Sequence, residues 1–219
     1  MPRLLFEKTG NAVWISHLDL MRLFQRAFKR GGLALTHTQG FNPRPSVSIA
    51  LPLSVGTQSR CELLDFELDG EAVSCDEILK RLNSSLVEGI RVLQVYENGN
   101  KIKHLSYLDC TVSFVYDREV SEKDSTTIRE LFCRPSLMVE KKSKNGVTQQ
   151  DIMPMIRKLD VSLQDSHTVV IHGRICCQNP TLNPAQLTAA VQRYLPELTP
   201  DRVSYIREEI YDTEEKIFR

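Results

Sequence analysis

Apolar side chains recur at helical spacing in the segment that follows Ser16. At 100° per residue they fall on one side of a single helix: Leu20, Leu23, Phe24, Ala27 and Phe28. Ser16 is a favoured N-cap residue, and Asp19 three positions later gives a variant of the capping box. The pair Gly31-Gly32 ends the pattern. The sequence therefore predicts a helix over 17–30.

The loop that follows this helix is unusually rich in proline and polar side chains. After a strand predicted over 33–38, the segment Gln39–Pro45 reads Gln-Gly-Phe-Asn-Pro-Arg-Pro, which contains too many breakers for a regular element. Its two prolines restrict the backbone, so the loop should be stiff. We expect the loop to return toward the helix start, where free N–H groups and the helix dipole favour an anion. The expected result is an electropositive hollow.

The remaining elements suggest that one pattern occurs twice. Both halves are interpreted as strand–helix–strand–strand–helix–strand, the order of a ferredoxin-like unit. The predicted fold class is therefore α+β, with two ferredoxin-like halves at 1–100 and 101–219 whose antiparallel sheets each carry helices on one face. The seam is placed near residues 98–104, and the repeat is one of pattern rather than of sequence identity.

The charges of the chain are unevenly distributed, although 28 basic and 28 acidic side chains give a net charge of zero over 219 residues. Residues 1–60 hold eight Lys and Arg against two acids, and residues 61–100 hold nine acids against three basic residues. A basic patch on the first third is consistent with nucleic-acid contact and equally with a solvated helix face.

Several classes of site find no support in the sequence. The six cysteines show no Cys-x2-Cys spacing and are interpreted as reduced, and no His-x3-His or carboxylate cluster suggests a metal. A Walker A loop, a Gly-x-Gly-x-x-Gly run and a Gly-x-Ser-x-Gly elbow are all missing, so we predict no cofactor. No apolar run is long enough to span a bilayer, and a cytoplasmic location without a membrane partner is expected.

Several motifs resemble those of a bacterial domain of unknown function, the radical SAM-linked protein family. The motifs are His17–Arg22, Gln39–Pro45, Leu51–Gly56, Asp151–Ile156 and Asn183–Leu187, and the likeness covers most of the chain. Members of that family accompany radical SAM enzymes and RNA-processing genes, so the resemblance implies a radical SAM enzyme or RNA as partner. A weaker likeness, in architecture and in the early helix, is to tandem ferredoxin-like CRISPR RNA-processing endonucleases, which can use a histidine as general acid.

The candidate site residues lie on the predicted helix and loop. His17 is the candidate general acid/base, with a structural histidine at the helix–loop junction as the alternative. His104, His167 and His172 are interpreted as ordinary turn or strand residues. The candidates for RNA or anion binding are Arg22, Arg26, Lys29, Arg30, Gln39, Phe41, Asn42 and Arg44, the arginines and lysine for phosphates and Phe41 for a base.

Three functions remain open. The first is a non-catalytic module that associates with RNA or with a radical SAM enzyme. The second is a metal-independent ribonuclease in which His17 acts as acid/base and Arg44 stabilises phosphate charge. The third is a protein-interaction adaptor without nucleic acid. The sequence leaves open whether the chain is an enzyme and what its oligomeric state is.

Overall fold

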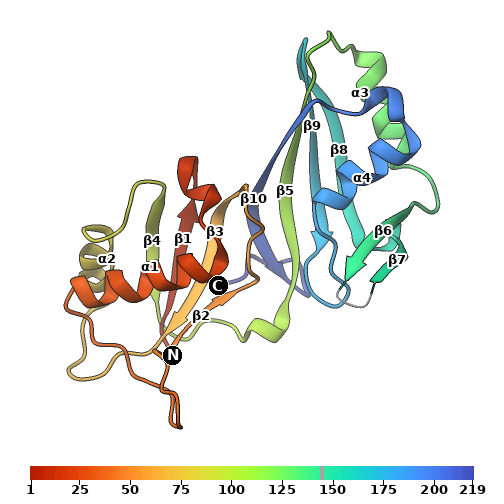
Figure 1. The fold of residues 1–219 in the computed structure, drawn as a ribbon. Coiled ribbons are helices and arrows are strands. Elements are labelled where there is room, and N and C mark those ends of the chain that lie inside the picture. The colour runs from red at the N-terminus through yellow and green to blue at the C-terminus, as the bar shows by residue number, and fades with distance from the viewer. Residues whose placement is uncertain (144–145) are drawn as a thin grey trace. The chain divides into compact units, whose positions relative to one another are not determined.

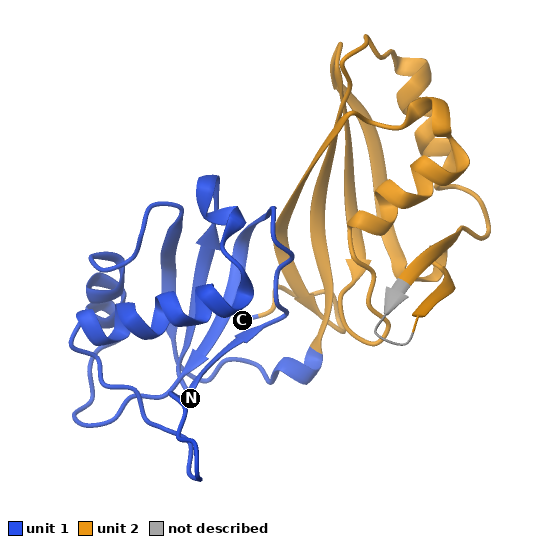
Figure 2. Ribbon diagram, viewed as in Figure 1, with its two compact units in different colours: residues 1–104, 219 blue, residues 105–218 orange. Residues whose placement is uncertain are grey.

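The computed structural model describes residues 1–143 and 146–219 and shows an α+β fold, as predicted. The chain divides into two compact units, residues 1–104 with Arg219 (unit 1) and residues 105–218 (unit 2) (Figure 2).

Unit 1 is a four-stranded antiparallel sheet in the order β4-β1-β3-β2 (Figure 1). Two helices cover one face of this sheet and contribute to its core. The elements are β1 (Arg3–Lys8), a 3-10 turn η1 (Gly10–Trp14), α1 (His17–Arg30), β2 (Val47–Ala50), β3 (Thr57–Phe66), α2 (Cys75–Asn83), β4 (Ile90–Tyr96) and η2 (Ile102–His104).

Two aromatic contacts anchor α1 to this sheet. The ring of Phe24 meets that of Phe6 edge to face at a centroid distance of 4.7 Å. One turn further, the ring of Phe28 packs on Phe66 at 5.0 Å. All four side chains are fully buried. Since aromatic pairs add to the free energy gained from burying their area, the apolar side of α1 is fixed and its polar side faces outward.

Unit 2 contains a four-stranded antiparallel sheet in the order β10-β5-β9-β8, with two helices on one face (Figure 1). A separate hairpin of β6 and β7 lies beside α4. The elements are β5 (Leu105–Val115), α3 (Glu122–Leu131), β6 (Met138–Ser143), β7 (Gly146–Asp151), η3 (Met153–Met155), β8 (Ile156–Asp165), β9 (Thr168–Cys176), α4 (Ala185–Tyr194), η4 (Pro196–Leu198) and β10 (Arg202–Asp212).

The strand predicted over 33–38 is wrong in its continuity. Leu35 and His37 each form only an isolated bridge, to Leu68 and Pro45 respectively. The physical reason is that the backbone changes its partner within two residues. Leu35 pairs with Leu68, just after β3, whereas His37 pairs with Pro45 at the other end of the Gln39–Pro45 loop. A regular ladder needs one partner strand over several residues, and this segment has none.

Candidate functional site: a groove beside helix α1

Hydrogen bonds from a lysine of β1 hold the start of α1 in place. The ammonium group of the buried Lys8 donates hydrogen bonds to the carbonyl oxygens of Val13 (3.1 Å) and Ile15 (2.8 Å), which lie just before the helix. Burial lowers the pKa of Lys8, although the charge of Glu62 acts against this shift. These hydrogen bonds give two carbonyl oxygens at the junction a partner that they would otherwise lack. The position of the first helical turn is therefore set by β1.

The predicted N-cap is confirmed. The backbone N–H of Asp19 donates to Ser16 Oγ (3.3 Å), and Ser16 Oγ donates to Asp19 Oδ2 (2.7 Å). Arg22 Nη1 in turn donates to Asp19 Oδ1 at 3.0 Å. The hydrogen bonds from Ser16 and Arg22 hold the pKa of Asp19 below its ordinary value. The first turn of α1 therefore carries an ionised carboxylate whose charge is already matched.

Two adjoining hollows follow the polar side of α1 and together form what we call the α1 groove. The cationic hollow has a volume of about 720 Å³ and is lined by His17, Leu18, Met21, Arg22, Gln25, Thr38, Arg44, Pro45, Ser46, Val47 and Ser48 together with Met1. The apolar hollow has about 450 Å³ and is lined by Gln25, Arg26, Lys29, Leu33, Ala34, Leu35, His37 and Pro45. Gln25 and Pro45 line both, so the hollows are neighbours.

The groove is electropositive. Its lining includes four cationic side chains and two histidines, whereas none of the described residues that line either hollow is Asp or Glu. Arg22, Arg26 and Lys29 follow one another along the helix and span about 10 Å from first to last, at 1.5 Å per residue. All three are exposed. Because the apolar side of α1 is locked to the sheet, these charges stay directed into the groove.

Only some of the predicted site residues line this groove. His17, Arg22, Arg26, Lys29 and Arg44 do so.

The other predicted candidate on α1, Arg30, points elsewhere. Its Nη2 donates to the carbonyl of Ser85 at 2.5 Å, and it lines neither hollow.

The base of the Gln39–Pro45 loop contributes to the groove, but its tip does not. The backbone N–H of Thr38 donates to Arg44 O (2.8 Å), and Arg44 N–H donates to Thr38 Oγ1 (3.0 Å), which closes the loop as a narrow hairpin. The tip side chains Gln39, Phe41 and Asn42 are exposed and line neither hollow, with Phe41 fully exposed at 105%. The loop extends away from the helices instead of covering the helix start (Figure 1).

Most residues that line the groove were not among the predicted site residues, and three of these, Gln25, His37 and Thr38, carry polar side chains beside the predicted cations. Gln25 follows Arg22 by three positions on α1, so the helical period could have indicated it. His37 and Thr38 lie in the segment predicted as a strand. The face to which their side chains point could not be predicted without knowing which segments pair with this one.

The imidazole of His17 is half-buried and, within the described part of the chain, makes no hydrogen bond. It is thus a ring in the cationic hollow without an orienting partner. The hydrogen bond to a backbone carbonyl expected of a structural histidine is therefore not formed among the described residues, and the nearby carbonyls of Val13 and Ile15 accept from Lys8.

No group of three or more His, Cys, Asp or Glu side chains suited to a metal ion occurs in residues 1–143 and 146–219. Over the same residues, none of the helices is both long and apolar enough to cross a membrane.

The comparisons with known proteins give a family and little else. No curated protein matches the chain. Among solved structures, the crystal structure of an unknown protein from Galdieria sulphuraria aligns over 94% of this chain and 96% of its own, at 11% identity and a TM-score of 0.27. A family model described as "Uncharacterized protein conserved in bacteria (DUF2344)" matches residues 2–184. The chain therefore belongs to this family of uncharacterized bacterial proteins.

Proposed function

We propose that the chain is a non-catalytic RNA-binding module and that single-stranded RNA lies along the α1 groove. The observation that carries the proposal is the charge of the lining, which combines four cations with no carboxylate among the described residues. Neutralising phosphates with arginine and lysine supplies most of the affinity of proteins for nucleic acids. A solvated helix face would not need a groove beside it.

The two hollows match the two parts of a nucleotide. Leu33, Leu35 and Pro45 give the apolar hollow a surface for a base, and Arg26 and Lys29 at its rim can meet the adjacent phosphates. Its volume of about 450 Å³ suits a single small ligand group.

The cationic hollow adds groups that distinguish RNA from DNA. Thr38, Ser46 and Ser48, which carry hydroxyl groups, line this hollow together with Arg44. Hydroxyls can both donate to and accept from a ribose 2′-OH, which DNA lacks. We therefore expect RNA to bind more tightly than DNA of the same sequence.

The experiment compares two arginines of the same helix. Arg26→Gln removes a cation from the groove, whereas Arg30→Gln removes the same charge from a residue that lines neither hollow. Binding of a fluorescent single-stranded RNA should weaken about five- to tenfold for Arg26→Gln and stay near the original value for Arg30→Gln. Equal losses would mean that only net charge matters, and the groove would not be the site.

A metal-independent ribonuclease is the second candidate, favoured by the place of His17. Its imidazole shares the cationic hollow with Arg22 and Arg44, so a general acid/base and two phosphate-binding cations come together. The test is cleavage of single-stranded RNA in the presence of a chelator. Loss of cleavage in His17→Ala, with an unchanged unfolding transition, would support this candidate, and intact RNA with the original protein would end it.

Two expectations from the sequence extend the proposal. Strand orders β4-β1-β3-β2 and β10-β5-β9-β8, each with two helices on one face, support two ferredoxin-like units.

The resemblance to radical SAM-linked proteins implies a radical SAM enzyme as partner. An adaptor of that kind, acting without RNA, would co-purify with the enzyme even after ribonuclease treatment.

A further inference from the structure

The single tryptophan of the chain lies exposed immediately before α1. Trp14 is the last residue of η1, and 70% of its surface is accessible to solvent. Two more exposed apolar side chains belong to neighbouring segments, Val55 from the loop before β3 and Leu18 from the first turn of α1. An indole left in water stabilises the core little, and exposed apolar side chains that adjoin one another mark a contact with another molecule.

Hydrogen bonds hold the backbone on both sides of Trp14. The carbonyl oxygen of Val13 accepts from the N–H of Gly56 (2.9 Å) and from the buried ammonium of Lys8 (3.1 Å). The same ammonium donates to the carbonyl oxygen of Ile15 at 2.8 Å. Trp14 is therefore presented on a fixed backbone, and little conformational entropy is lost when it binds a ligand.

A glycine supports part of the indole ring. A Cβ added to Gly56 would lie 3.3 Å from Cζ3 and 3.7 Å from Cη2 of Trp14, so the six-membered ring packs on the backbone at this residue. The φ of +83° at Gly56 lies in the left-handed region that favours glycine. The indole thus rests on the chain along one part and stays open to solvent over most of its surface, as an aromatic platform for stacking does.

The platform lies close to the cationic hollow of the α1 groove. His17 and Leu18 line that hollow and follow Trp14 by three and four residues. Because a chain spans at most about 3.6 Å per residue, the Cα atoms of Trp14 and His17 are no more than about 11 Å apart. Asp19, in the first turn of α1, is already paired with Arg22 at 3.0 Å, so its charge is matched where a strand would pass.

We propose that the RNA strand continues from the cationic hollow past the start of α1 and that an unpaired base stacks on the indole of Trp14. This inference rests on the RNA binding proposed for the α1 groove. It narrows the ligand to RNA that is single-stranded at this end, because the bases of a duplex are stacked on one another. The cations of the groove attract any polyanion, whereas the tryptophan requires a base of any identity.

Abasic RNA separates these two contacts. Since Trp14 is the only tryptophan, the tryptophan emission of the full chain reports this ring alone. Single-stranded RNA should quench the emission, with the same midpoint as the anisotropy of a labelled strand. An abasic strand of the same length should bind with a similar salt dependence but leave the emission unchanged. Equal quenching by both strands would overturn the proposal.

Variants give an independent measurement. Trp14→Ala and Trp14→Leu should weaken the binding of intact RNA about fivefold or more and leave the binding of abasic RNA unchanged, whereas Trp14→Phe should keep most of the affinity. Phe41→Ala is the matched control, because it removes a ring that is more exposed and lines neither hollow. Its RNA binding should stay at the original value, and an unchanged unfolding transition shows that each variant is folded.

The possible results distinguish this inference from the proposed function. If intact RNA binds with the expected salt dependence but neither the emission nor the affinity depends on Trp14, the stacking is refuted and the groove stands. If no RNA binds at low salt, both proposals fall. A blue-shifted emission with vesicles of anionic phospholipid, and no change with RNA, would assign the ring to a membrane surface and overturn the proposal.

Discussion

Salt dependence is the sharpest test of the RNA binding proposed for the α1 groove. Each phosphate neutralised on a single strand contributes about 0.7 to the slope of log affinity against log salt. The groove presents four cations, but Arg22 already shares its charge with Asp19 at 3.0 Å, so we count three to four. The expected slope is about −2.1 to −2.8. Between about 50 and 200 mM salt, the affinity should then fall roughly 20- to 50-fold.

Removing one cation should change this slope by a fixed amount. Arg44→Gln should make it shallower by about 0.7, whereas Arg30→Gln should leave it unchanged because Arg30 is bonded to the Ser85 carbonyl outside the groove. Fluorescence anisotropy of a labelled oligonucleotide at several salt concentrations measures both slopes. Trp14, the single tryptophan, is 70% exposed just before α1 and offers a second signal from the protein itself. A slope shallower than about −1, or an equal change in the two variants, would refute the reasoning.

Three further predictions concern single positions. Gly89→Ala should lower the free energy of unfolding by about 2–4 kcal/mol in urea titrations, because φ is +84° and a Cβ would lie 2.4 Å from the carbonyl oxygen of Thr9; a loss under about 1 kcal/mol would contradict this. Phe41→Ala should change the free energy of unfolding by less than about 0.5 kcal/mol, since the ring is fully exposed, and should leave RNA binding unchanged because Phe41 lines neither hollow; weaker binding would show that the loop tip also contacts RNA. Asp109→Asn should cost about 1–3 kcal/mol at pH 7 through the lost ionic bonds to Arg174, and because the folded pKa of Asp109 is lowered, the difference from the original protein should shrink as pH falls below about 4; a difference independent of pH would argue against an ionised Asp109.

The parts of the fold that could be predicted are those with local causes. Helix α1 begins and ends where the sequence places it, because its cap at Ser16, its apolar spacing and its glycine stop all lie within the helix or beside it. Four of the predicted residues that line the groove, His17, Arg22, Arg26 and Lys29, lie on this helix. Pro154 has a local effect of the same kind, since β8 begins only at Ile156, after a 3-10 turn that contains this proline.

The remaining features depend on contacts between distant segments. The direction of the Gln39–Pro45 loop is set by the bonds between Thr38 and Arg44, which a proline count does not reveal. His172 was interpreted as an ordinary strand residue, because its partners Thr111 and Glu208 lie on other strands that only the sheet order brings together. Alternation of polar side chains along β9 could have indicated a polar face, but not which hydroxyl and carboxylate would share it.

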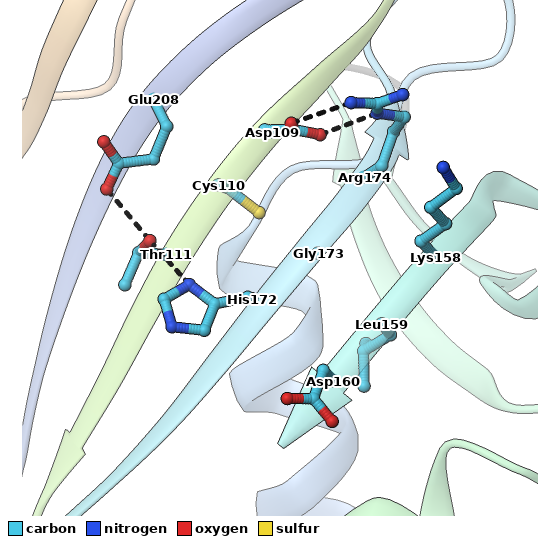
Figure 3. A pocket seen from close by; sticks show the side chains of 10 residues that line it. All are labelled: Asp109, Cys110, Thr111, Lys158, Leu159, Asp160, His172, Gly173, Arg174 and Glu208. Atoms are coloured by element: carbon cyan, nitrogen blue, oxygen red, sulfur yellow. Dashed lines mark hydrogen bonds and ion pairs between the residues drawn. The ribbon is translucent and has the colours of Figure 1, made fainter. Parts of the chain in front are cut away.

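His17 and His172 differ in whether a hydrogen bond orients the imidazole ring. A general base needs a ring held in one orientation and tautomer, which the chain from Glu208 through Thr111 provides for His172 and which no described residue provides for His17. The α1 groove needs no such order to bind phosphates, since its cations act by charge and position alone. The RNA binding proposed for unit 1 is therefore separable from the hydrogen-bonded His172 of unit 2 (Figure 3). Arg44→Gln should weaken the first without moving the ring nitrogens of His172, and Thr111→Val should alter those nitrogens without changing the salt slope.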